Sequence, residues 1–147
     1  ATNMLSPFEK TRLQDVFRGP SSDAVIRAAA EFTENADKNS LGRLEAALKP
    51  HDCAKWTVVT YLPYLWRPDR HMFLKPEVTK DFAARVGHPF AYNYEARLNI
   101  DVYASLLDLV ERTNRELSDL EPRDRIDIQS FIWVVGDYQE DRDGTYT

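Results

Sequence analysis

Four side chains that bind anions in other proteins are concentrated in one short stretch of the sequence. Arg67, Arg70, His71 and Lys75 fall within nine consecutive positions that end just before Pro76. Guanidinium groups bind carboxylates and phosphates through charged, often paired, hydrogen bonds. Pro76 predicts the first position of a helix, whose leading backbone N–H groups also attract anions. The pattern predicts a site for an anionic ligand, with Arg70 as the principal contact and Arg67 and Lys75 as flanking charges.

The same stretch also has a purely structural interpretation. The sequence Arg67-Pro68-Asp69-Arg70 is typical of a turn. Within such a turn, Asp69 would pair with Arg67 or Arg70, and Lys75 would remain solvated. Both interpretations stay open from the sequence alone.

A carboxylate farther along the chain is a candidate partner for this turn. Asp127 lies inside an otherwise apolar run near the end of the sequence. A partly buried carboxylate needs a compensating partner, and we predict that Asp127 orients Arg70. In the alternative interpretation Asp124 or Asp127 is the N-cap of a final helix, and the apolar residues that follow are core.

The sequence contains no recognisable catalytic or metal-binding motif. It lacks the glycine-rich signatures of phosphate and dinucleotide sites and the motifs of zinc proteases and serine hydrolases. His51 and Cys53 flank Asp52, but zinc requires three or four ligands. We therefore predict no catalytic residue, no metal ligand and no cofactor, and favour a non-catalytic binding or accessory module.

An enzyme is the third functional class that the residues leave open. Cys53 could act as a nucleophile with His71 as its base, and Asp69 and Asp127 could converge on the same cleft. Against this, Cys53 precedes an apolar helix, where a small buried residue is common.

Composition and charge limit the remaining classes. The chain has 147 residues and a net charge of −5, yet residues 67–85 carry five basic and three acidic side chains. An acidic protein with one basic island is not a general nucleic-acid binder, although it could contact a polyanion locally. The single cysteine excludes an internal disulfide, and no stretch reaches the roughly 20 apolar residues of a membrane span. We expect a cytoplasmic protein without membrane contact.

Helix start and stop signals recur along the chain and predict an all-α fold. Ser6-Pro7-Phe8-Glu9 has the form of a capping box, and Gly19-Pro20 should end the helix that follows. A second helix should begin after Ser22 or Asp23 and a third at Ser40. Residues 53–66 are ambiguous because their β-branched side chains also suit a strand. We favour a helix there, capped by Asp52 and bent or ended by Pro63.

The second half of the chain continues this pattern. A helix should run from Pro76 to Gly87, and Asn99 or Asp101 should cap the longest helix, over residues 100–118, which we place centrally. A final helix over 126–135 should pack against it. These signals predict a single domain of six to seven helices over residues 1–136, followed by an acidic, mobile tail over 137–147.

An aromatic segment provides an alternative function. Residues 88–99 read as an irregular loop containing Phe90, Tyr92 and Tyr94, in a chain with three tryptophans, seven tyrosines and seven phenylalanines. An exposed aromatic patch here would favour a protein–protein interaction or a homodimer. In the other interpretation, the loop folds back onto the core.

A resemblance adds to these predictions. The resemblance rests on the order of four features along the chain: Trp56-Thr57-Val58-Val59-Thr60, the stretch from Arg67 to Pro76, Gly87, and the stretch from Asp127 to Trp133. In this order, over roughly residues 55–135, the chain resembles a group of uncharacterised bacterial proteins. It is also similar to helical segments of restriction and phage-defence proteins. The resemblance implies a helical domain in a bacterial, DNA-related or defence system, and it carries over no catalytic residue.

Overall fold

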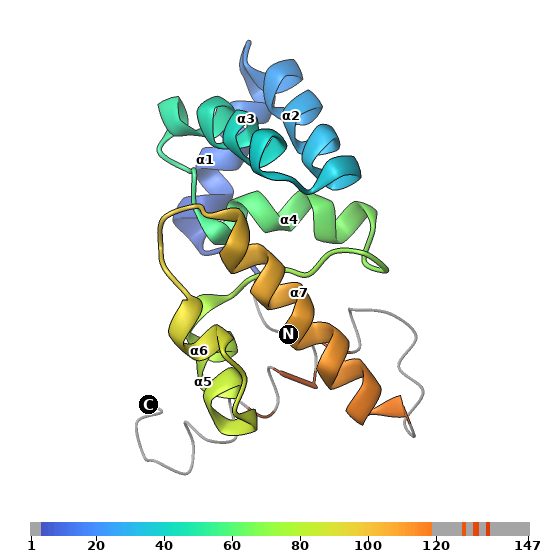
Figure 1. Cartoon of the computed structure of the whole chain (residues 1–147). Helices are drawn as coiled ribbons and strands as arrows, with labels where there is room; N and C mark the ends of the chain where they lie inside the picture. Colours follow the sequence, from blue (N-terminus) through green and yellow to red (C-terminus); the bar gives the residue numbers. More distant parts are fainter. Residues whose placement is uncertain (1–3, 119–127, 129–130, 133–134, 136–147) are drawn as a thin grey trace.

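The computed structural model of the chain describes residues 4–118, 128, 131, 132 and 135 (Figure 1). The described residues form helices and no strands, as the sequence predicts. In chain order the elements are α1 (Pro7–Arg18), α2 (Ser22–Asn35), α3 (Lys38–Leu48), the 3-10 helix η1 (Lys49–His51), α4 (Trp56–Trp66), α5 (Pro76–Val86), α6 (Phe90–Asn93) and α7 (Ile100–Glu116).

Figure 1 shows two groups of helices joined by α7. Helices α1 to α4 lie together in the upper part of the view, and α5 and α6 lie below them. Helix α7 runs from beside α4 past the lower group, and it is the longest helix among the described residues. One face of α7 is buried along its whole length, which is why the sequence shows a broad apolar stripe there.

Local capping signals predict several helix boundaries correctly. Ser6 and Glu9 form the expected capping box at the start of α1, with distances of 3.0 and 3.2 Å between backbone nitrogens and side-chain oxygens. Gly19 ends this helix. At the start of α7, the Asn99 side chain accepts from the Asp101 backbone N–H at 2.9 Å. These caps satisfy helix-end N–H groups that would otherwise lack partners.

Three predicted caps are wrong. Helix α2 begins at Ser22, so its N-cap is Ser21, whose side chain makes no capping bond. Helix α3 begins at Lys38 because Asp37 accepts from the Ser40 N–H, which places Ser40 inside the helix as the reciprocal partner. Asp52 adopts a left-handed conformation after η1, with φ of 52°, and therefore does not start α4.

The ambiguous segment is a helix, α4, and Pro63 lies inside it. Val58, Val59 and Thr60 are buried, so tertiary packing outweighs their preference for strands. Pro63 neither ends the helix at once nor prevents its last turn, because its carbonyl still accepts from the Arg67 N–H at 2.9 Å. Helix α4 continues to Trp66.

The residues of the predicted final helix that the structure describes are helical and packed inward. Ile128 and Ile132 are buried, and the Phe131 ring meets the ring of Phe82 in α5 edge-on, with 6.0 Å between ring centroids. The other residues of this predicted helix, and the predicted tail at 137–147, lie outside the described residues.

The predicted aromatic loop contains a short helix, α6, and only one of its three predicted patch residues is exposed. Phe90 is buried and Tyr94 is half-buried, whereas Tyr92 is 89% exposed. Phe90 is therefore part of the core. Its ring packs against the ring of Tyr94, with 5.9 Å between the ring centroids. Within the described part of the chain, no helix is long and apolar enough to span a membrane.

Candidate binding site at the basic turn

The basic stretch is a turn that connects α4 to α5. The N–H groups of Arg70 and His71 both donate to the Arg67 carbonyl, at 3.0 and 2.9 Å, which closes the turn predicted from the sequence. The three apolar residues that follow, Met72 to Leu74, are buried. The Leu74 N–H donates to the Thr60 hydroxyl of α4 at 2.9 Å. The turn is therefore fixed from both sides.

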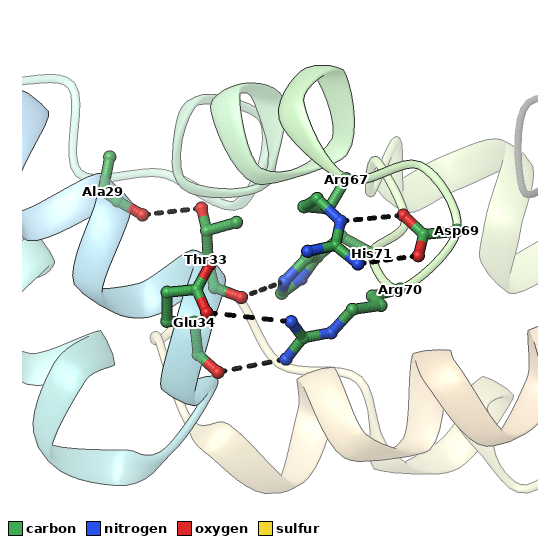
Figure 2. A network of polar contacts seen from close by, with 7 residues as sticks. All are labelled: Ala29, Thr33, Glu34, Arg67, Asp69, Arg70 and His71. Carbon is green, nitrogen blue, oxygen red and sulfur yellow. Dashed lines mark hydrogen bonds and ion pairs between the residues drawn. The ribbon is translucent and has the colours of Figure 1, made fainter.

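Arg67 and Asp69 form the ion pair of the structural interpretation. The Nε and Nη2 atoms of Arg67 donate to the two carboxylate oxygens of Asp69 at 3.1 and 3.0 Å (Figure 2). This paired hydrogen bond lowers the pKa of Asp69. The two side chains remain 43% and 56% exposed, so the pair is a surface feature with a small net contribution to stability.

Arg70 reaches a different helix, and it does so through the helix backbone. Its Nη2 atom donates to the Glu34 carbonyl at 3.0 Å, and its Nη1 atom lies 3.9 Å from the Glu34 carboxylate (Figure 2). Glu34 is in the last turn of α2, and this turn contains no basic residue. Arg70 therefore supplies the positive charge that the C-terminus of a helix favours.

His71, predicted from the sequence as one of the ligand contacts, is buried. The side chain is 1% exposed, and its Nε2 and Nδ1 atoms lie 2.7 Å from the Thr33 carbonyl and the Tyr103 hydroxyl, respectively. Because a carbonyl only accepts, Nε2 carries a proton and donates to Thr33, and in the neutral ring Nδ1 then accepts from the Tyr103 hydroxyl. The Met72 N–H lies 3.4 Å from the same hydroxyl. His71 thus joins the turn to α2 and α7.

Of the other two predicted site residues, one is at the start of α5 and one is outside the described residues. Lys75 is the N-cap of α5 and is half-buried, and its side chain makes no capping bond. Asp127 lies outside the described residues, so its pairing with Arg70 stays a prediction. The carboxylate that the structure places beside Arg70 belongs to Glu34.

The nucleophile and base considered for an enzyme do not come together. Cys53 is buried, its Sγ atom lies 3.8 Å from the Leu48 carbonyl, and burial raises the pKa of its thiol. Both ring nitrogens of His71 are bonded to Thr33 and Tyr103. Among the described residues, no group of three or more His, Cys, Asp or Glu side chains could hold a metal ion.

Sequence reasoning missed two apolar residues beside the turn. Leu65 and Trp66, at the end of α4, are 49% and 44% exposed. They directly precede Arg67 in the chain, and the Arg67 and Arg70 side chains are 43% and 41% exposed. We call these four residues, Leu65, Trp66, Arg67 and Arg70, the α4-end surface. Nothing in the sequence distinguishes this tryptophan from the other large aromatic residues, most of which pack inward in the described part of the chain.

The charges at this surface balance. Arg67 and Arg70 are accompanied by the carboxylates of Asp69 and Glu34, which are 56% and 67% exposed. Glu34 also acts on Arg67, since it contributes, after Asp69, to the raised pKa of that guanidinium. The four charges therefore form one cluster without net charge, which can bind through matched pairs but does not attract polyanions over a distance.

Comparison of the sequence with protein-family models and with curated proteins, and of the fold with solved structures, found no match.

Proposed function

We propose that the protein is a non-catalytic module that binds another protein through the α4-end surface. The observation that carries this proposal is an exposed leucine and tryptophan that directly precede a turn with two exposed arginines. Tryptophan and arginine are among the residues that contribute most to the binding energy of protein interfaces. A partly exposed indole at the start of a turn that carries two fixed guanidinium groups suits such a contact.

The arrangement of charges supports a protein partner over nucleic acid. Phosphates approaching Arg67 or Arg70 would also approach the carboxylates of Asp69 and Glu34. A protein surface can present carboxylates and basic groups in the complementary order, and such mixed charges fix the orientation of a protein complex.

The two arginines are already held in place, which lowers the entropy that binding costs. Arg67 is fixed by both oxygens of Asp69, and Arg70 by the Glu34 carbonyl. The turn that carries them is anchored by buried residues on its C-terminal side. Side chains ordered before binding lose less rotamer freedom when a partner arrives.

Site-specific cross-linking tests this proposal. We would replace Leu65 with the photo-reactive residue p-benzoylphenylalanine and irradiate cells that make the protein. In a control variant, the same photo-reactive residue would replace the exposed Phe17 of α1. We expect a cross-linked partner, which can be a second copy of the chain, only from position 65. The purified partner should then bind the Trp66→Ser variant at least tenfold more weakly, and the Tyr92→Ser variant as tightly as wild type. Equal affinity for Trp66→Ser would refute the proposal.

A second candidate is the contact with nucleic-acid phosphate predicted from the sequence. The observation in its favour is that the exposed Trp66 directly precedes a turn with two exposed arginines, because bases stack on aromatic side chains while arginines contact phosphates.

A salt series of binding to single- and double-stranded DNA and RNA tests this candidate. Arg67→Ala is compared with Arg97→Ala, because each arginine pairs with an acid two positions away, Asp69 and Glu95. Binding through phosphates should weaken steeply with salt and be lost only in Arg67→Ala. Absence of binding at low salt would remove this candidate and leave the protein-binding proposal in place.

A further inference from the structure

A cavity of about 600 Å³ lies between α5, α7 and the described residues of the final helix. Its volume falls within the range of small-molecule sites, roughly 300–1,000 Å³. Most of its lining is apolar, and the apolar side chains are Phe82, Val86, Leu109, Leu117, Phe131 and Val135. It shares no residue with the α4-end surface.

Specific contacts hold the walls of this cavity. Gly87, with φ of 71°, ends α5 and turns the chain toward His88. The Nδ1 atom of His88 accepts from the Phe90 N–H at 3.0 Å, so Nε2 carries the proton and donates to Asp108 of α7 at 2.8 Å. This bond lowers the pKa of Asp108. The His88–Asp108 bond ties the end of α5 to α7.

The polar groups of the lining are already engaged or balanced. The Thr113 hydroxyl donates to the Leu109 carbonyl at 2.8 Å, and both ring nitrogens of His88 are bonded. The charged lining residues are Arg112 and Glu116, which are exposed and of opposite sign, and Arg112 pairs with Asp108 at 3.0 Å. A ligand would therefore gain its affinity from apolar contact, and no net charge in the lining would hold an ion.

We propose that this cavity binds an uncharged, largely aromatic or hydrocarbon small molecule, at a site separate from the protein-binding surface. An uncharged molecule fits because the walls offer apolar contacts and a balanced pair of charges at the rim. The inference does not depend on the proposed function, and the two can fail independently.

Two fluorescent probes with the same aromatic skeleton test the site and its charge preference. N-phenyl-1-naphthylamine is uncharged, whereas 1-anilinonaphthalene-8-sulfonate carries a sulfonate. We expect the uncharged probe to bind the full chain saturably, with one molecule per chain, and at least tenfold more tightly than the sulfonate. Weaker binding of the uncharged probe than of the sulfonate, or comparable binding of the two, would overturn the proposed ligand class.

Matched variants locate the probe. Val86→Phe enlarges an exposed residue of the lining, and Ile26→Phe introduces the same residue at an exposed aliphatic position of α2 that does not line the cavity. We expect at least tenfold weaker binding in Val86→Phe and unchanged binding in Ile26→Phe, at equal melting temperatures. Equal binding in both variants would overturn the assignment.

A measurement on the unaltered protein keeps the test decisive if Val86→Phe does not fold. The uncharged probe should shift the methyl NMR signals of Leu109, Leu117 and Val135, which line the cavity, and should leave those of Val25 and Leu41 in place. No saturable binding, or shifts confined to other methyl groups, would show that the cavity is not a binding site.

Discussion

The buried hydroxyl of Tyr103 offers the sharpest test of how the basic turn is held. The Tyr103→Phe change removes one oxygen atom, which lies 2.7 Å from His71 Nδ1 and 3.4 Å from the Met72 nitrogen. The ring itself would keep its contacts with Phe32 and Trp56, at centroid distances of 5.3 and 6.4 Å. The change therefore isolates the hydroxyl.

The expected cost follows from the two groups that lose this hydroxyl. Leaving a buried polar group without its partner costs about 1–3 kcal/mol. The short bond to His71 should contribute most, and the long contact with Met72 less, so we expect a loss of about 3 kcal/mol in the free energy of unfolding. For a domain of this size that corresponds to a fall of about 10 °C in melting temperature. Urea denaturation followed by tryptophan fluorescence and by circular dichroism measures it.

Tyr92→Phe is the matched control, because the same oxygen is removed from a side chain that is 89% exposed. A surface change of this kind should stay within about 0.5 kcal/mol. A double-mutant cycle with His71→Phe should give a coupling energy of about 1 kcal/mol or more with Tyr103→Phe. A loss below about 0.5 kcal/mol in Tyr103→Phe would refute the reasoning that His71 and Tyr103 hold the turn together.

Three further predictions concern backbone conformation, the thiol and acid stability. An added methyl group would meet no atom within contact distance at Gly87 or Gly42, so backbone conformation decides the effect of alanine at each position. Gly87→Ala should destabilise the protein by about 1 kcal/mol because φ is +71°, whereas Gly42→Ala inside α3 should stabilise it by about 0.5–1 kcal/mol because alanine favours a helix. Thermal melts in which both changes have the same sign would contradict this. The buried Cys53 thiol should react with a disulfide reagent at pH 8 only as fast as the protein opens, and immediate reaction in the native state would disprove its burial. The hydrogen bond from the Ser40 N–H lowers the pKa of the Asp37 carboxyl from its usual 3.8. The ionised Asp37 therefore stabilises the folded state fully above about pH 4, and this stabilisation is lost as pH falls through the lowered pKa of the folded protein. Asp37→Asn should therefore keep its melting temperature at pH 6 and show a shallower fall below pH 4, and an unchanged acid slope would contradict this.

Much of the fold could be predicted because the signals that define it are local. The Ser6–Glu9 capping box and the Asn99 cap depend on residues within three positions of each other. The start of α3 could not be settled in this way, because Asp37 and Ser40 are both good N-caps and the structure uses them reciprocally. Helix α4 does not end at Pro63 for a different reason, since its packing outweighs the loss of one backbone bond.

The candidate site was only partly predictable because its partners are distant in the chain. The sequence identified the basic cluster and a local pair of Asp69 with either Arg67 or Arg70, of which the structure forms the pair with Arg67. It could not show that Arg70 contacts Glu34, 36 positions earlier, or that His71 contacts Tyr103, 32 positions later. Polarity alone suggests an exposed histidine, whereas these two long-range bonds are what permit its burial.

The way in which α2 ends has a consequence for the order of folding. Its last turn contains no basic residue, and the carbonyls of Thr33 and Glu34 receive their side-chain donors from His71 and Arg70. A nascent chain that has emerged only as far as α4 still lacks both donors, so the end of α2 should fray until the following turn has docked. The N-terminal helices are therefore completed by residues synthesised after them, and α2 should gain its full protection from hydrogen exchange together with the α4–α5 connection.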